Sequence, residues 1–129
     1  MGAKFSAIDI GSNAIRMIVG ETQKSDIKIL KKFRAPVRLG RDVFLNGSIT
    51  NKTMQEAHEA FKEFAKTNRK FKVARCRAVA TSAVREAQNR ENFVKAIFDS
   101  SKIAIEVIDG VEEARLVHNA IRKEIDLQK

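Results

Sequence analysis

The sequence predicts a single α/β domain with a mixed five-stranded sheet and helices on its faces. Its 129 residues suit one hydrophobic core, because single domains usually span about 100–200 residues. Hydrophobic residues make up 43% and charged residues 32%, which is enough apolar material for a core. Apolar residues alternate with period two in the first strands, recur every three or four residues over 54–65, and then switch between the two periods.

Two short strands joined by a tight turn are expected at the start of the chain. Residues 5–10 alternate apolar and small side chains, and β-branched residues resume at 15–19 after a Gly-Ser-Asn turn at 11–13. This pattern is typical of an antiparallel hairpin. A third strand is expected over 27–37, and Pro36, the only proline, marks its end because proline cannot donate to a sheet.

A long helix is expected next, after a loop. Residues 39–48 show neither period and are predicted to form that loop. Thr50 is placed to cap the first turn of a helix of about five turns. The apolar residues on one face of this helix are Met54, Ala57, Phe61, Phe64 and Ala65.

The second half of the chain is predicted to alternate strands and helices. The expected elements are a strand over 73–80, a short helical segment over 82–87, a helix capped by Asn89, a strand over 103–108, a turn at Asp109-Gly110 and a helix over 111–125. Cys76 is expected to be a small buried side chain in the first of these strands. With right-handed connections, this order of elements gives the ribonuclease-H-like plan.

The charge of the chain indicates an anionic partner. Lys and Arg outnumber Asp and Glu by 25 to 16, a formal charge of +9. Such a surface attracts nucleic acid, polyphosphate or a phosphorylated nucleotide, although basic surfaces also serve solubility. The apolar runs are far shorter than the roughly 20 residues that cross a bilayer, and we expect a cytoplasmic protein without a membrane span. The single cysteine allows no internal disulfide.

A candidate anion site lies where the first strand ends. Asp9 is followed by Gly11, Ser12 and Asn13, and the glycine of such a turn can expose backbone N–H groups to a phosphate. Ser12 and Asn13 add neutral donors, whereas Asp9 suits a metal ion or a water because a carboxylate repels phosphate. An ordinary hairpin turn beside a surface aspartate explains the same residues equally well.

Further candidate residues carry charge. Arg16 follows the turn and Arg85 follows the strand over 73–80, so both are expected at the same end of the sheet. Arginine suits bidentate phosphate contact, but each of these residues is also compatible with a solvated or salt-bridged side chain. Glu112 and Glu113 fall in the first turn of the last predicted helix, where acidic residues favour the helix dipole. A glutamate facing a phosphate-lined cleft would instead act as a general base on water.

Three segments carry a family resemblance: AIDIGSNAIR at 7–16, RAVATSAVREAQN at 77–89 and EVIDGVEEARL at 106–116. In order and spacing they resemble the N-terminal part of the exopolyphosphatase/guanosine pentaphosphate phosphatase family, within the actin, Hsp70 and sugar-kinase superfamily. The resemblance implies a hydrolase that removes terminal phosphoryl groups from polyphosphate, or the 5′ phosphate from guanosine pentaphosphate, with Mg²⁺. The site residues that it implies are Asp9 for the metal, Gly11, Ser12, Asn13, Arg16 and Arg85 for phosphate, and Glu113 as the catalytic base.

Members of that family have a second lobe with another phosphate loop, whereas this chain stops at Lys129. We therefore expect one N-terminal lobe over residues 1–129, impaired in isolation, that pairs with the missing lobe or self-associates. Two alternatives stay open: a small ribonuclease-H-like nuclease and a non-catalytic polyanion-binding module. The nuclease, and nucleic acid as a partner, is disfavoured because the strand over 73–80 runs into Thr81-Ser82 without the carboxylate that two-metal cleavage needs.

Overall fold

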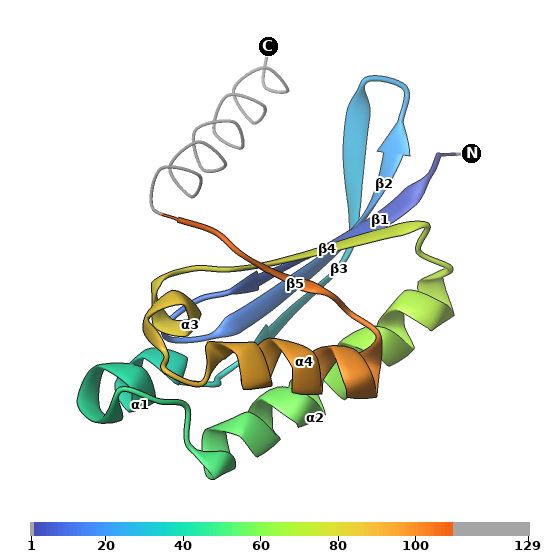
Figure 1. The fold of residues 1–129 in the computed structure, drawn as a ribbon. Coiled ribbons are helices and arrows are strands. Elements are labelled where there is room, and N and C mark those ends of the chain that lie inside the picture. Colours follow the sequence, from blue (N-terminus) through green and yellow to red (C-terminus); the bar gives the residue numbers. More distant parts are fainter. Residues whose placement is uncertain (1, 110–129) are drawn as a thin grey trace.

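The computed structural model describes residues 2–109, which form a sheet with helices packed against it (Figure 1). In chain order the elements are β1 (Lys4–Ile10), β2 (Ile15–Gln23), β3 (Asp26–Ala35), α1 (Leu39–Asn46), α2 (Asn51–Phe71), β4 (Arg75–Ala80), α3 (Ser82–Glu86), α4 (Arg90–Ser101) and β5 (Ile105–Val107). The helix predicted over 111–125 lies outside the described residues. Within 2–109, no helix is both long and apolar enough to cross a membrane.

The sheet has the mixed topology that the order of elements predicts. Its five strands lie in the order β3-β2-β1-β4-β5. The strand β1 pairs antiparallel with β2 and parallel with β4, and β5 continues the parallel half beside β4. This ribonuclease-H-like arrangement brings the carboxyl ends of β1, β4 and β5 to one edge of the sheet.

One face of the sheet forms the core. Alternate residues of β1 and β2 point to this face, and α2 and α4 pack across it (Figure 1). The largest fully buried side chains are Phe61, Phe93, Ile8, Ile10, Ile15, Met17, Leu39, Ile97, Val19 and Val84. The intervening residues of β1 and β2, which include Asp9 and Arg16, are exposed on the opposite face, called the open face below. Period-two alternation therefore separates the core residues from the candidate site residues.

The loop prediction for residues 39–48 is wrong, because Leu39–Asn46 forms the helix α1. Gly47 ends this helix with a left-handed φ of 79° and donates its N–H to the carbonyl of Val43. The helical period is hidden in the sequence because one of the inward positions is Asp42, a charged residue that is only 7% exposed. Asp42 is retained there by Thr50, whose N–H and hydroxyl both donate to its carboxylate at 3.0 and 2.6 Å.

The two predicted helix caps behave differently. Thr50 caps α2 as predicted, because its hydroxyl oxygen accepts from the N–H of Thr53 at 3.3 Å. Asn89 stands at the N-terminal boundary of α4, but its side chain makes no cap hydrogen bond. Its amide instead pairs with the backbone of Ile49, accepting from the N–H at 3.0 Å and donating to the carbonyl at 2.9 Å. Asn89 therefore ties the start of α4 to the segment before α2.

The prediction that Cys76 is buried is also wrong, because this residue is exposed. The first three residues of β4 are all exposed, and burial begins at Ala78. Only the second half of this strand lies under the helices, a distinction that no local residue pattern carries.

Candidate functional site

The turn between β1 and β2 is closed by its own backbone. Ile10 and Ile15 form the last pair of the hairpin, and the N–H of Gly11 donates to the carbonyl of Ala14 at 3.1 Å. Gly11 does not adopt the left-handed conformation, which among the described glycines is found only at Gly47. The N–H of Gly11 is therefore used inside the turn, and the role of Gly11 in phosphate binding stays a prediction.

The amides that remain for an anion are those of Ser12 and Asn13. Neither N–H donates to a backbone carbonyl among the described residues. The carbonyl of Ser12 is used elsewhere: it accepts from the N–H of Gly40, in the first turn of α1, at 2.8 Å. The loop is thus fixed on its carbonyl side and keeps two N–H groups for a ligand, the pattern expected of a backbone anion site.

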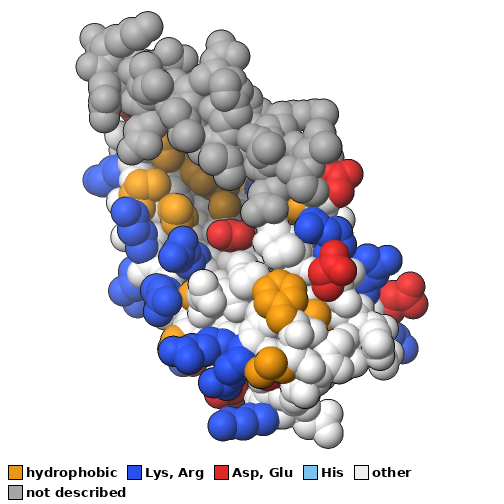
Figure 2. Space-filling view, turned by 90° about the vertical axis from the view of Figure 1, so that its left-hand side faces the viewer, with side chains coloured by type: hydrophobic (Ala, Val, Ile, Leu, Met, Phe, Trp, Pro, Cys, Tyr) orange, Lys and Arg blue, Asp and Glu red, His pale blue; other side chains and the backbone are white. Residues whose placement is uncertain are grey.

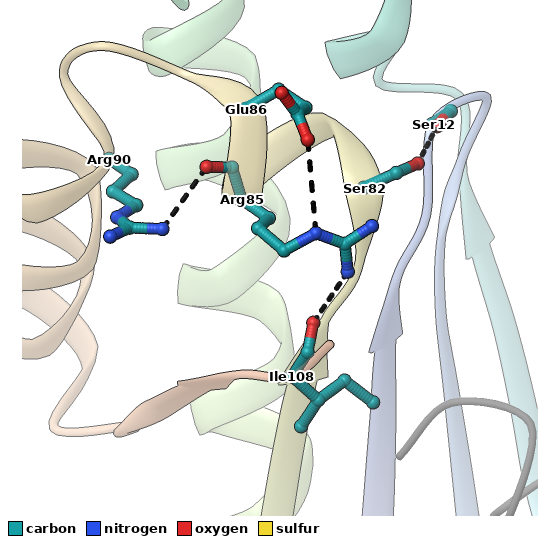
Figure 3. A network of polar contacts seen from close by, with 6 residues as sticks. All are labelled: Ser12, Ser82, Arg85, Glu86, Arg90 and Ile108. Carbon is teal, nitrogen blue, oxygen red and sulfur yellow. Dashed lines mark hydrogen bonds and ion pairs between the residues drawn. The ribbon is translucent and has the colours of Figure 1, made fainter. Parts of the chain in front are cut away.

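The loop also contacts α3, on the other side of the sheet edge. The N–H of Thr81 donates to the carbonyl of Ile10 at 3.3 Å, and the hydroxyls of Ser12 and Ser82 lie 3.4 Å apart (Figure 3). These contacts follow from the parallel pairing of β1 with β4, which ends at Ile10 and Ala80. Two segments about 70 residues apart therefore meet where the sequence places its first and second motifs.

Arg85 lies at this same edge. One terminal nitrogen of its guanidinium group donates to the carbonyl of Ile108 at 2.7 Å, and its Nε lies 3.9 Å from a carboxylate oxygen of Glu86 (Figure 3). Its side chain is 28% exposed. Ile108 is itself held by an N–H donated to the carbonyl of Ala80 at 2.9 Å. Arg85 is therefore fixed between α3 and the end of β5, with part of its guanidinium group open to solvent.

Asp9 and Arg16 lie on the open face, directly opposite each other in the pairing of β1 with β2. Both line a hollow of about 400 Å³ together with Ile18, Arg77 and Val79. Asp9 precedes Gly11 by two residues, but it lines a different hollow from the one that Ser12 and Asn13 line. The structure thus brings Asp9, Arg16, the loop and Arg85 to one end of the sheet, divided between the edge and the open face.

Asp9 is the only acidic residue among those lining the hollow on the open face, so it is the candidate ligand for a magnesium ion there. Within residues 2–109, no group of three or more His, Cys, Asp or Glu side chains could hold a metal ion. Mg²⁺ is usually bound through one or two carboxylates, with water and substrate phosphates supplying the other ligands. Asp9 fits this requirement as a single protein ligand close in sequence to the candidate anion loop at 11–13.

The structure adds a hollow that the sequence did not predict. It has a volume of about 520 Å³ and is lined by Ser12, Asn13, Arg34, Arg38, Gly40, Arg41 and Phe44. The only local signal was the run of arginines at 34, 38 and 41, which fell across the end of a predicted strand and a predicted loop. Figure 2 views this end of the molecule, where α1 and α3 lie in Figure 1, and shows Lys and Arg side chains gathered along one side.

Glu113 and its neighbour Glu112 lie outside the described residues. Asp109, the last described residue, is exposed just after the end of β5. The role given to Glu113 as a base stays a prediction.

Comparison with known proteins identifies relatives that match most of this chain. A bifunctional 3-dehydroquinate synthase/phosphatase of Fusobacterium nucleatum is 29% identical in an alignment 128 residues long, which covers 94% of this chain and 19% of that protein. The solved structure of the Aquifex aeolicus Ppx/GppA family member superposes with a TM-score of 0.89 at 29% identity, covering 94% of this chain and 40% of that one. An exopolyphosphatase from Cytophaga hutchinsonii gives a TM-score of 0.84 at 29% identity, covering 88% and 36%.

The chain therefore spans less than half the length of these relatives. The model of the Ppx/GppA phosphatase family matches residues 17–129. By fold and by sequence, this chain belongs to the Ppx/GppA phosphatase family.

Proposed function

We propose that this chain is the phosphate-binding N-terminal lobe of a phosphohydrolase that cleaves terminal phosphoanhydride bonds of polyphosphate or guanosine pentaphosphate. The observation that carries the proposal is the convergence of three kinds of anion donor at one sheet edge. The loop keeps the N–H groups of Ser12 and Asn13, α3 contributes a hydroxyl at Ser82, and Arg85 is fixed beside them. Hydrolysis of a phosphoanhydride depends mainly on such positioning and charge neutralisation.

Each side chain has a distinct part in this proposal. The amides and side chains of Ser12 and Asn13 bind oxygens of the terminal phosphoryl group. Arg85 binds further oxygens with the part of its guanidinium group that Ile108 and Glu86 leave open. Arg16 adds positive charge on the open face. Gly11 keeps the turn tight, because an added Cβ would lie 3.3 Å from the carbonyl oxygen of Ala14.

Asp9 would hold Mg²⁺, which when bound neutralises charge on the phosphate oxygens. Asp9 has no acidic neighbour in its hollow, and Arg16 is its direct cross-strand partner on β2. The exposure of Asp9 leaves room for water molecules bound to the metal ion.

Glu113 is proposed as the general base that takes a proton from the attacking water. In the sequence it follows Ile108, whose carbonyl Arg85 contacts, by five residues, and Glu112 directly precedes it. The family resemblance assigns the proton transfer to Glu113.

Phosphate release from long-chain polyphosphate in the presence of Mg²⁺ tests this assignment. Because the chain matches only 36–40% of its solved relatives, we expect slow turnover by the chain alone. Glu113→Gln should lower that rate by about 100-fold or more, the usual contribution of a general base. Glu112→Gln is the matched control, with the same chemistry one residue away, and should leave most of the rate.

Robust turnover that survives Glu113→Gln would contradict the role of Glu113. Salt-sensitive binding of polyphosphate with no turnover would favour the polyanion-binding module, which the net charge of +9 also supports. Within residues 2–109, no observation favours the nuclease, because that chemistry needs several carboxylates together.

A further inference from the structure

Arg34, Arg38 and Arg41 line the 520 Å³ hollow, called the arginine hollow below, together with two residues of the loop at 11–13. Ser12 and Asn13 contribute to both, so a ligand on the loop amides would reach directly into a space of about 520 Å³. Arg34 comes from the end of β3, whereas Arg38 and Arg41 come from the start of α1. Three cationic side chains from β3 and the start of α1 therefore line a hollow together with Ser12 and Asn13.

The positive charge of this hollow is only partly balanced by the described part of the protein. None of its three guanidinium groups forms an ion pair with a described residue, and all three residues are exposed. Asp42, the acid next to Arg41 in the chain, is buried and accepts two hydrogen bonds from Thr50, and its charge also interacts with that of Arg41. Asp42 therefore offsets only part of the charge of the three arginines.

The sheet register concentrates the charge further. Arg34 is the direct cross-strand partner of Arg16, and Arg16 is in turn the partner of Asp9. Like charges directly opposite each other on neighbouring strands are destabilising unless an anion lies between them. Asp9 is the acidic cross-strand partner of Arg16. Arg34, which lines the hollow, has only the like-charged Arg16 as its partner on β2.

The geometry of α1 keeps the hollow against the loop. Besides the hydrogen bond from its N–H to Ser12, Gly40 packs so closely that an added Cβ would lie 2.7 Å from the Cβ of Ser12. The helix start and the loop are thus in direct contact, and Arg38 and Arg41 flank the contact point. A site with fixed walls loses less entropy on binding than a set of independent surface side chains.

We propose that the arginine hollow binds the linked phosphoryl groups that follow the terminal one in the substrate. This inference rests on the proposed function, in which the loop holds the terminal group. Arginine is suited to this task because its planar guanidinium group donates to two phosphate oxygens at once and stays charged. The ligand class is a chain of anhydride-linked phosphates, whether inorganic or attached to a nucleoside.

Phe44 provides a way to distinguish an inorganic phosphate chain from a nucleotide as the ligand. Its ring lies at the rim of the hollow over Gly40 and is 62% exposed, so a nucleobase attached to the phosphates would have an aromatic surface on which to stack. Inorganic chains make no such contact. A Phe44→Ala variant therefore weakens binding of a nucleoside triphosphate only if the base stacks there.

Isothermal titration of the 129-residue chain with inorganic tripolyphosphate, orthophosphate and guanosine 5′-triphosphate tests the proposal. Arg38→Gln and Arg41→Gln should each weaken tripolyphosphate binding about fivefold to tenfold, and orthophosphate binding much less, because orthophosphate occupies the loop alone. The matched control is Arg75→Gln, which removes one exposed charge at the opposite end of the sheet. Arg75 lies about 16 Å along β4 from Ala80, where this strand ends near the loop. It should change none of the affinities by more than about twofold, with melting temperatures confirming that every variant folds.

The outcomes separate this inference from the proposed function. Wild-type affinity of Arg38→Gln and Arg41→Gln for tripolyphosphate, an equal loss in Arg75→Gln, or no binding by the unaltered chain at millimolar ligand would overturn the inference. A Ser12→Ala, Asn13→Ala double variant tests the loop: unchanged orthophosphate binding would count against the proposed function while leaving an arginine effect intact. Loss of guanosine triphosphate binding in Phe44→Ala identifies a nucleotide as the source of the phosphates, and no loss identifies the inorganic chain.

Discussion

At the scale of single residues, the site depends on which backbone N–H and carbonyl groups already form hydrogen bonds within the protein. The N–H of Gly11 is used inside its turn, and the carbonyl of Ser12 is used by Gly40, so the loop presents donors rather than acceptors to a ligand. Sequence inspection identifies Gly, Ser and Asn as turn residues, but it does not show which amide closes the turn. That depends on the β1–β2 register, which ends at Ile10 and Ile15.

Gly40 gives a prediction at this scale. Alanine in a helix is normally favoured over glycine by about 1 kcal/mol. At position 40 the added Cβ would lie 2.7 Å from the Cβ of Ser12 and 3.2 Å from its carbonyl oxygen. Because overpacking costs about 1–3 kcal/mol, we expect Gly40→Ala to lower the free energy of unfolding by about 1 kcal/mol and to weaken orthophosphate binding as the loop shifts. Urea denaturation and titration calorimetry measure the two effects.

Gly47→Ala is the control for this prediction. Its φ of 79° makes alanine unfavourable by about 1 kcal/mol, but a Cβ there would meet Gln88 and not the loop. It should therefore reduce stability without changing phosphate affinity. A stabilised Gly40→Ala variant with normal phosphate binding would show that the contact between α1 and the loop leaves room for an added Cβ.

At the scale of elements, the helices are positioned by polar contacts at their first turns and N-terminal boundaries. Asp42 of α1 accepts two hydrogen bonds from Thr50, whose hydroxyl oxygen also caps α2. One buried acid in the first turn of α1 thus fixes this helix against the start of α2, and Asn89 ties the start of α4 to Ile49. The long helix was predictable from its apolar period, whereas α1 was not, because its inward acid only makes sense beside Thr50.

Asp42 predicts a pH dependence of stability. Burial by itself raises the pKa of Asp42, but hydrogen bonds from Thr50 and Thr53 and the charge of Arg41 lower it, so that the net pKa is below the ordinary value of 3.8. The stability that the ionised carboxylate supplies is therefore fully present above pH 3.8 and is lost as the pH falls through the lower pKa of the folded state.

Asp42→Asn should accordingly reduce the free energy of unfolding by about 1–3 kcal/mol at pH 7, and the difference from the unaltered chain should shrink below pH 3.8. Chemical denaturation over a pH series measures it. Asp99→Asn, at an exposed position of α4, is the matched control and should change stability by less than about 0.5 kcal/mol. An equal loss in both variants, or a difference that grows toward acid pH, would be incompatible with this role for Asp42.

At the scale of the whole molecule, the charge of +9 couples folding to anion binding. Self-repulsion among 25 basic side chains opposes the compact state, and a bound polyanion removes part of that repulsion. A ligand at 100 times its dissociation constant stabilises the folded state by about 2.7 kcal/mol. We therefore expect saturating tripolyphosphate to raise the melting temperature by several degrees at low salt, and by much less at about 1 M salt, where the Debye length is about 3 Å. A salt-independent increase would argue against an electrostatic site.

The sequence by itself determined the class of fold and the identity of most candidate residues. Alternation in residues 5–19 and the apolar period after Thr50 are local patterns, set by the geometry of a strand and of a helix, and the three motifs carried the family. Only the tertiary structure decided which residues meet. The contact of Ser12 with Ser82 and the gathering of Arg34, Arg38 and Arg41 beside the loop depend on strand register and helix packing, which join segments that are far apart along the chain or belong to different elements.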